Sequence, residues 1–294
     1  MVGKSYSLVT KVVAGSASQR LGKGLSEALK CDLVQIESKR FPDGEGYVRI
    51  LSDVSGETVA IVQNTYPDQN MVELFLLQDA TRRAGAKRII TVVPYFGYAR
   101  QDKQFQPGEA ISASALAKLI EAHSDATITV DLHNLNTLAS FSKPVANASV
   151  MKATGEFLKG KADAILSPDK GSIGRAREAA RVAGVQFDHI EKKRLDGSTV
   201  QMTPKELNVR GKRVAIVDDI IATGGTMMKA AEQLRAQGAT RVIAVCTHGL
   251  FTGGALDKLR QSFDEVHACD TLESPASTIS AAGSIAAEIY KFRS

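Results

Sequence analysis

The densest group of chemically capable residues lies between residues 218 and 226. Two adjacent carboxylates follow the apolar run 214–217 and precede glycines and threonines that lead into an amphipathic segment. Glycines let backbone N–H groups approach an anion, threonines offer hydroxyls, and a helix start adds its dipole. Because two carboxylates would repel a phosphate, they suit vicinal ribose hydroxyls or a metal on them. The run predicts a sugar-phosphate site; a glycine-rich turn with solvated carboxylates is the alternative.

Four other polar segments could contribute chemistry. Residues 40–45 offer an aromatic face for a base and two carboxylates for an exocyclic amine, or else form a β-turn on their Pro-Asp-Gly sequence. Residues 100–103 include a guanidinium that can bind phosphate oxygens through two N–H groups. Two predicted strands end at His133 and Asp169, and the basic stretch 191–196 is typical of a charged hairpin tip.

The elements that must position these residues follow a βαβ rhythm, in which short apolar runs alternate with amphipathic segments. Strands are predicted at residues 8–14, 58–63, 88–94, 127–131, 164–167, 214–217 and 241–246, and helices at 18–29, 71–84, 112–122, 151–158, 172–183, 226–237 and 279–292. This predicts an α/β protein with two similar domains, residues 1–146 and 147–294, each a mainly parallel sheet flanked by helices. Ligands of such sheets bind outside the carboxyl ends of the strands, where the candidate residues fall.

Composition narrows the function classes. A chain of 294 residues with 44% hydrophobic residues can bury two ordinary cores, and its apolar runs are too short to span a membrane. The N-terminus lacks the apolar segment of a secretory signal, and three widely spaced cysteines fit a reducing compartment, so we expect a cytoplasmic protein. The net charge of +5 comes without a basic block, which argues against a nucleic-acid partner.

Residues 218–226 resemble the phosphoribosyl-diphosphate-binding loop of phosphoribosyltransferase-fold proteins. From about Ser7 to the C-terminal helix, the chain resembles the ribose-phosphate diphosphokinases, also called phosphoribosyl pyrophosphate synthetases. This resemblance implies two tandem phosphoribosyltransferase-like domains. It also implies transfer of the diphosphoryl group of ATP to the 1-hydroxyl of ribose 5-phosphate, with Mg²⁺ as the metal and nucleotide biosynthesis as the purpose.

The resemblance assigns roles to individual residues. It implies ATP binding by Phe41, Asp43, Gly44, Glu45, Arg100 and Gln101. The first four would serve a neighbouring subunit, so a homo-oligomer, at least a dimer, is expected. It implies catalytic roles in a mobile loop for Lys192 and Arg194, and metal binding by His133 and Asp169 across a cleft between the domains. Ribose 5-phosphate would bind to Arg194, Asp218, Asp219, Ala222, Thr223, Gly224, Gly225 and Thr226.

Some positions depart from the family pattern. Ala222 stands where many members carry an aspartate, which excludes a carboxylate role there. The loop after Lys103 lacks the further basic residues of members regulated by phosphate and ADP, and no tail follows the last helix. The chain thus resembles the shorter archaeal-type members, and weak or absent control by phosphate and ADP is expected. A phosphoribosyltransferase proper and a non-catalytic regulatory homologue are the alternatives.

Overall fold

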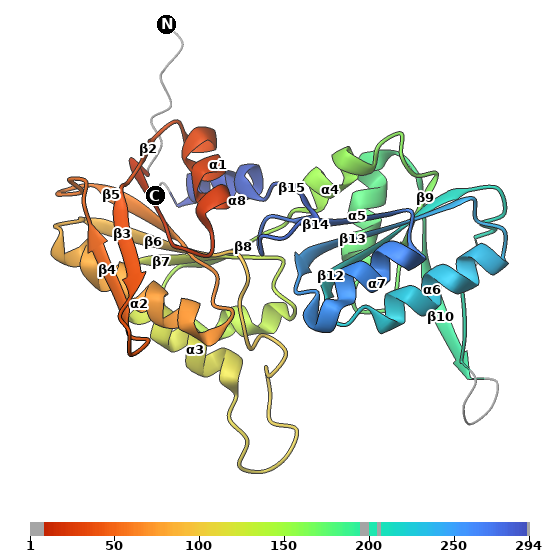
Figure 1. Ribbon diagram of the computed structural model, residues 1–294, viewed down its shortest axis with the longest axis horizontal. Coiled ribbons are helices and arrows are strands. Elements are labelled where there is room, and N and C mark those ends of the chain that lie inside the picture. The colour runs from red at the N-terminus through yellow and green to blue at the C-terminus, as the bar shows by residue number, and fades with distance from the viewer. Residues whose placement is uncertain (1–8, 195–199, 205–206, 293–294) are drawn as a thin grey trace, which may run out of the picture. The chain divides into compact units, whose positions relative to one another are not determined.

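The computed structural model describes residues 9–194, 200–204 and 207–292; of residues 191–194 and 200–203 it describes the backbone. The chain forms two compact units (Figure 1), Met1–Ser149 with Ser280–Ser294, and Val150–Ile279. Among the described helices, none is long and apolar enough to cross a membrane.

The two compact units differ from the predicted domains at the C-terminus. The boundary at residues 149 and 150 is close to the expected one, but the prediction grouped residues 280–294 with the second half. In the structure, α8 (Ala282–Lys291) packs against α1 (Gln19–Leu29) of the first unit. Its apolar side, including the fully buried Ile285 and Ile289, is covered there, so the last helix completes the first unit.

The first unit is built on a six-stranded sheet in which every pair is parallel. Its order is β2-β1-β5-β6-β7-β8. The strands are β1 (Lys11–Ala14), β2 (Asp32–Leu33), β5 (Thr58–Val62), β6 (Arg88–Val93), β7 (Ala126–Val130) and β8 (Val145–Ala148). The central strands are almost wholly apolar because both faces are buried, as parallel sheets require.

Helices cover both faces of this sheet (Figure 1). α1 and α8 lie on one face, and α2 (Asp68–Arg83) and α3 (Ser112–Ala122) lie on the other. The buried Leu74 and Leu77 of α2 pack with Leu116 and Ile120 of α3 in the hydrophobic core on that face. A separate antiparallel hairpin, β3 (Ile36–Arg40) and β4 (Gly46–Ile50), packs against α2, and a 3₁₀ helix, η1 (Leu135–Ser140), follows β7.

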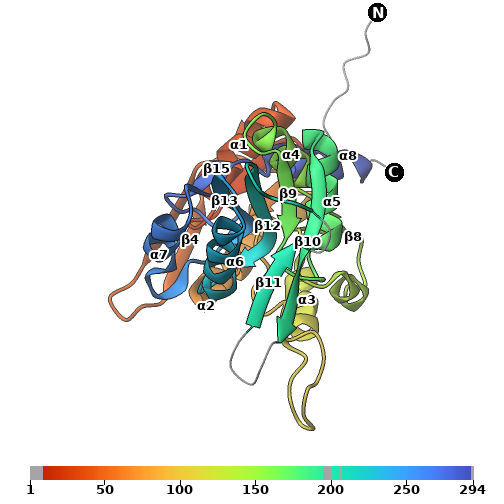
Figure 2. The same cartoon turned by 90° about the vertical axis from the view of Figure 1, so that its right-hand side faces the viewer.

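The second unit repeats the plan with seven strands, ordered β11-β10-β9-β12-β13-β14-β15. They are β9 (Ala164–Ser167), β10 (Gln186–Arg194), β11 (Val200–Pro204), β12 (Arg213–Ile221), β13 (Arg241–Gly249), β14 (Glu265–Cys269) and β15 (Ser277–Ile279). The pair β10–β11 is antiparallel and the others are parallel. α5 (Ile173–Ala183) packs on α4 (Met151–Leu158), while α6 (Gly225–Ala236) and α7 (Ala255–Ser262) lie across the sheet from α5 (Figure 2). A short 3₁₀ helix, η2 (Thr252–Gly254), precedes α7.

The predicted two parallel-sheet halves are therefore confirmed, while several element boundaries differ. β12 runs to Ile221 because its pairing with β13 continues to Gly249, whereas the apolar pattern predicted an end at residue 217. The domain boundary expected between residues 146 and 147 falls inside the edge strand β8.

Each sheet has one topological switch point, where successive connections leave in opposite directions. In the first unit it lies between β1 and β5, because α1 leads from β1 to β2 while α2 leads from β5 the other way. We call residues 15–18 and 63–65 the first switch point. In the second unit it lies between β9 and β12, and residues 168–172 and 218–226 form the second switch point. Ligands of open α/β sheets bind at such places.

Candidate active site

Asp218 and Asp219 lie in the last part of β12, where strand pairing fixes their backbone. Asp219 is 4% exposed, and its Oδ2 is 3.4 Å from Nη1 of Arg175 on α5. Its Oδ1 accepts a hydrogen bond of 2.8 Å from the backbone N–H of Ile220. The charge of Asp219 is therefore balanced largely by the protein itself.

Asp218 lies in a different environment. Its Oδ1 accepts hydrogen bonds from the Ser172 hydroxyl at 2.5 Å and from the Asp219 N–H at 2.9 Å. Burial raises the pKa of Asp218 to about 7, and the nearby charges of Asp219 and Asp169 add to the rise. A carboxyl group held this way gains stability from any ligand that donates protons or positive charge to it.

Asp169 lies in the turn between β9 and α5 and is exposed. Its Oδ1 accepts from the backbone N–H groups of Gly171 at 2.9 Å and Ser172 at 3.2 Å. Ser172 in turn is the N-cap residue of α5 and bonds Asp218. The structure thus brings Asp169 and the two aspartates of β12 to one edge of the sheet, as the strand ends predicted.

The loop after β12 is short and packs against the Leu259 side chain of α7. Gly224 has φ of +73° and precedes α6, and a Cβ atom there would lie 3.0 to 3.1 Å from the Leu259 side chain. The first intrahelical hydrogen bond runs from the Met228 N–H to the Gly224 carbonyl, so the N–H groups of Gly225 and Thr226 precede it. The hydroxyl-bearing Thr223 and Thr226 are exposed beside them. This arrangement can hold a phosphate group, and phosphate binding at these residues stays a prediction.

The neighbouring segment after β13 supports this loop. The N–H groups of Leu250 and Phe251 donate to the Ile221 carbonyl, and the Thr252 N–H donates to the Ala222 carbonyl at 3.1 Å. Ala222 thus contributes its backbone, and its side chain supplies no charge.

Residues 41–45 form the turn of the β3–β4 hairpin. The Gly44 N–H donates to the Phe41 carbonyl at 2.9 Å, and the Glu45 N–H donates to Oδ1 of Asp43 at 3.0 Å. Gly44 has φ of +93°, which suits glycine. Phe41 is 44% exposed, with its ring edge-on to Tyr47 at 5.8 Å. The β-turn considered from the sequence therefore exists, and it leaves an aromatic face and two carboxylates accessible.

The long loop after β6 has its own internal anchor. The carboxylate of Glu109 accepts from the N–H groups of Phe105 at 2.7 Å and Gln106 at 3.1 Å, and from Nε2 of Gln101 at 3.2 Å. The two backbone hydrogen bonds are the main cause that lowers the pKa of Glu109. Gln101 thus serves the loop itself, while Arg100 is exposed.

The other predicted residues are brought together less directly. His133 is exposed after β7 in the first unit, and Asp169 belongs to the second, so their shared binding of a metal stays a prediction. Within the described residues no group of three or more His, Cys, Asp or Glu side chains is arranged around a metal position. Lys192 and Arg194 lie on β10, opposite Met202 and Val200 of β11, and their side chains are outside the description. Up to Arg194, the implied mobile loop is therefore an antiparallel strand.

Comparison with known proteins identifies the family. Residues 10–123 match the N-terminal domain of ribose phosphate pyrophosphokinase, and residues 145–279 match the phosphoribosyl transferase domain. The chain is 43% identical over 282 residues to the ribose-phosphate pyrophosphokinase of Methanopyrus kandleri, covering 94% of this chain and 97% of that protein. The chain belongs to the ribose-phosphate pyrophosphokinase family.

Two further similarities agree with that family. The ribose-phosphate pyrophosphokinase of Pyrococcus furiosus is 41% identical over 273 residues, covering 92% of this chain and 96% of that protein. The crystal structure of phosphoribosylpyrophosphate synthetase from Mycobacterium smegmatis superposes with a TM-score of 0.81 at 30% identity, covering 96% of this chain and 97% of that chain. The family resemblance seen in the sequence is confirmed.

No role was assigned from the sequence to three residues that support the site of this ribose-phosphate pyrophosphokinase family member: Ser172, Arg175 and Glu109. Ser172 had a visible signal, since a serine after a strand and before a helix favours an N-cap. Arg175 had none, because its contact with Asp219 depends on how α5 is rotated against β12. Glu109 had no signal of its own in the sequence, because its role depends on the N–H groups of Phe105 and Gln106, which the fold of the loop turns toward its carboxylate.

Proposed function

We propose that this chain transfers the diphosphoryl group of ATP to the 1-hydroxyl of ribose 5-phosphate, giving phosphoribosyl pyrophosphate and AMP for nucleotide biosynthesis. The hydroxyl oxygen forms a bond to the β-phosphorus, and the bond from that phosphorus to the oxygen bridging the α-phosphorus breaks. AMP leaves with the bridging oxygen, and the hydroxyl proton passes to solvent. The observation that carries the proposal is the second switch point, where a carboxylate pair adjoins an open helix N-terminus.

Ribose 5-phosphate would bind at the second switch point, with Arg194 of β10 as a further partner. The N–H groups of Gly225 and Thr226 would hold the 5-phosphate because they precede the first hydrogen bond of α6, and the exposed hydroxyls of Thr223 and Thr226 would add to them. Asp218 would accept hydrogen bonds from the ribose hydroxyls. Asp219 would share this task less, since Arg175 and the Ile220 N–H already engage its oxygens.

ATP would bind through residues of the first unit. Phe41 offers an exposed ring for the adenine base, and Asp43 and Glu45 offer exposed carboxylates for its amino group. Gly44 permits the turn, and Arg100 offers an exposed guanidinium for the phosphates, with Gln101 holding the loop. Lys192 and Arg194 would stabilise the negative charge of the diphosphoryl group while it passes from the oxygen of AMP to the 1-hydroxyl oxygen of ribose 5-phosphate.

Mg²⁺ bound with ATP would neutralise part of the polyphosphate charge, and Asp169 and His133 are its proposed protein partners. The residues present fit such a cation: Asp169 is an exposed carboxylate, and burial, together with the charges of Asp219 and Asp169, raises the pKa of the neighbouring Asp218. No side chain at the second switch point is assigned as a general base. The chain's own contribution is positioning and charge.

Three further properties belong to the proposal. The Phe41 to Glu45 turn would serve a neighbouring copy, so the active form is at least a homodimer. The cytoplasmic location rests on the reducing-compartment argument from three cysteines. Weak control by phosphate and ADP rests on the composition of the loop after Lys103, and strong activation by phosphate, corrected for ionic strength, would contradict it.

The test is to mix the protein with ATP, Mg²⁺ and ribose 5-phosphate and to quantify AMP and phosphoribosyl pyrophosphate. Equal amounts of both are expected, and Lys192→Ala should remove the activity while the protein still melts cooperatively. Consumption of phosphoribosyl pyrophosphate with a free base, and no AMP, would instead identify a phosphoribosyltransferase. An inactive parent protein that binds an active synthetase would identify a regulatory homologue.

A further inference from the structure

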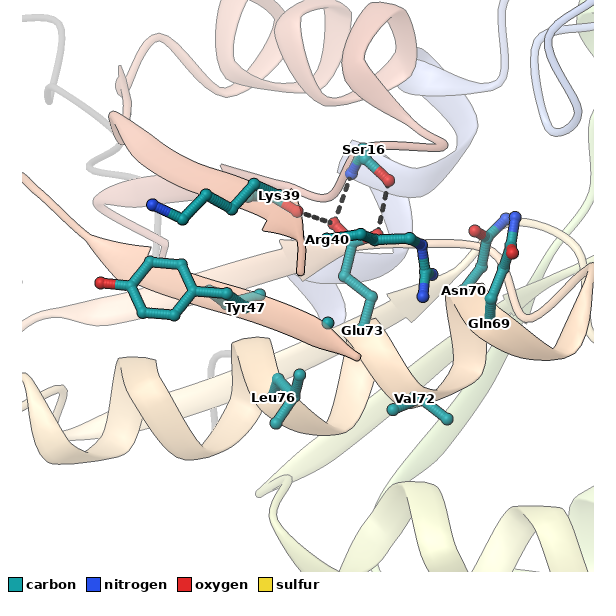
Figure 3. A pocket seen from close by; sticks show the side chains of 12 residues that line it. Ser16, Lys39, Arg40, Tyr47, Gln69, Asn70, Val72, Glu73 and Leu76 are labelled. Atoms are coloured by element: carbon teal, nitrogen blue, oxygen red, sulfur yellow. Dashed lines mark hydrogen bonds between the residues drawn. The ribbon is translucent and has the colours of Figure 1, made fainter. Parts of the chain in front are cut away.

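Glu73 of α2 is a buried carboxylate at the first switch point, only 6% exposed. It accepts hydrogen bonds from the Ser16 N–H at 2.9 Å and the Ser16 hydroxyl at 2.5 Å. Two more come from the Ser38 hydroxyl and from Nε2 of Gln63, each at 3.1 Å (Figure 3 shows Glu73 facing Ser16). A buried charge needs such partners, and here four donors converge on one carboxylate.

The four donors come from three separate segments. Ser16 follows β1 and Gln63 follows β5, so both belong to the rigid sheet edge. Ser38 is in the middle of β3, opposite Val48 of β4, and belongs to the hairpin. Glu73 therefore joins the β3–β4 hairpin to the sheet through one polar contact.

Near Ser38, apolar packing between the hairpin and α2 is incomplete, so it cannot substitute for the hydrogen bond to Glu73. A cavity of about 200 Å³ lies between the hairpin and α2, lined by Arg40 and Tyr47 on one side and by Asn70, Val72 and Leu76 on the other (Figure 3). Apolar contact holds the hairpin elsewhere, where Ile36, Val48 and Ile50 pack on the core. Close to the turn, Gly46 lies beside Leu76, and the cavity leaves the rest of this side loosely packed, so the hydrogen bond of Ser38 contributes to the direction of the strands.

We propose that Glu73 is a positioning residue for ATP, which acts through Ser38 to orient the hairpin turn that carries Phe41, Asp43 and Glu45. The inference rests on the proposed ATP-binding role of that turn. Glu73 itself does not touch the nucleotide. Ser38 is two residues before Arg40, whose pairing with Gly46 is the last before the turn, so a tilt at Ser38 displaces the whole turn.

The test compares Ser38→Ala with Ser38→Thr, measuring KM for ATP and for ribose 5-phosphate. Losing one hydrogen bond to a charged group should raise KM for ATP roughly tenfold, while Ser38→Thr, which keeps the hydroxyl, should stay near the parent value. KM for ribose 5-phosphate should change little, because that substrate is assigned to the second unit. Equal changes for both substrates, or none, would overturn the positioning role.

Glu73→Gln should raise KM for ATP more than Ser38→Ala does. Its amide N–H₂ group would face at least one of the four donors, and two donors cannot form a hydrogen bond with each other. Asp79→Asn is its matched control: the same change on the same helix, at an exposed carboxylate paired with Arg83. Thermal melting shows whether Glu73→Gln folds; if it does not, Ser38→Ala decides. Phe41→Ala separates the two proposals. If KM for ATP is unchanged in Phe41→Ala, the turn is not part of the ATP site, and both proposals fail there. If KM for ATP rises in Phe41→Ala but not in Ser38→Ala, only the positioning role is overturned.

Discussion

The two switch points of this molecule have the same topology and opposite contents. At the first, polar side chains bond one another: Gln63 and Asn64 are 0% and 2% exposed, and Glu73 accepts four hydrogen bonds. At the second, Thr223, Thr226 and Asp169 are exposed, and Asp218 has its pKa raised to about 7 by burial and neighbouring carboxylates.

The difference teaches that topology provides a place for a ligand, while side chains decide whether it is available. Ser18 and Ser172 illustrate this, since each is the N-cap residue of the helix after the first strand of its unit. The Ser18 hydroxyl accepts from the Asn64 N–H, an internal backbone contact. The Ser172 hydroxyl instead donates to Asp218, which faces the proposed substrate.

The largest expected effect is a pH dependence of stability that belongs to the second switch point. The folded-state pKa of Asp218, about 7, lies above its ordinary value of 3.8, so the folded protein binds more protons between these values. Stability from this group is therefore full below about pH 4 and declines as pH rises to 7, by about 4 kcal/mol at most. Chemical unfolding in metal-free buffer should show this decline relative to Asp218→Asn. Parallel pH profiles for the two proteins would contradict the raised pKa of Asp218.

Activity should respond to the same residue with a comparable energy. Asp218→Asn removes a charged acceptor for the ribose hydroxyls, so kcat/KM for ribose 5-phosphate should fall about a hundredfold. The variant should nevertheless melt at or above the parent temperature near neutral pH, because a buried charge is gone. Asp257→Asn, an exposed carboxylate on α7, is the control and should leave both quantities unchanged. Retained activity would show that Asp219, despite Arg175, is the main ribose ligand.

The sequence indicated the loop of the second switch point, although not its partners Ser172 and Arg175, and it did not indicate the contacts of the first. A glycine-rich run after an apolar strand is a local signal, so Asp218, Gly224 and Thr226 could be recognised without knowing their neighbours. Glu73 lies within the predicted helix 71–84 and belongs to no motif of the sequence. Its importance depends on contacts with Ser16, 57 residues away, and such distances leave no periodic pattern.

The fold was predictable for a related reason. Central parallel strands are apolar throughout and therefore obvious, whereas β2, β14 and β15 are short or near an edge and carry a weak pattern. β12 continues through two aspartates, although polar residues of this type are uncommon in strands, because its pairing with β13 outweighs the polarity of these side chains. Packing of α8 on α1 required knowing which apolar faces were left uncovered.

A third prediction tests how tightly Gly15 and Gln63 pack at the first switch point. In Gly15→Ala the new Cβ atom would lie 2.4 Å from Oε1 of Gln63, which cannot turn aside without losing its bonds to Ala17 and Glu73. Overpacking of this kind should lower the free energy of unfolding by about 2 kcal/mol while KM for ribose 5-phosphate stays constant. Gly283→Ala in α8 meets nothing within 4 Å and should not destabilise. Unchanged stability of Gly15→Ala would mean that the first switch point has room for a ligand after all.

The smallest expected effect comes from the two equivalent serines. Ser172→Ala removes the hydroxyl that orients Asp218, and the loss of one hydrogen bond of about 1 kcal/mol should raise KM for ribose 5-phosphate about fivefold. Ser18→Ala removes the matching hydroxyl at the first switch point, leaves the Asn64 N–H without its acceptor, and should lower the melting temperature with KM unchanged. Measuring both quantities in both variants assigns substrate binding to one serine and stability to the other. If Ser18→Ala changed KM for ribose 5-phosphate as much as Ser172→Ala, both switch points would affect substrate binding. The contrast between a binding site and a structural site would then be wrong.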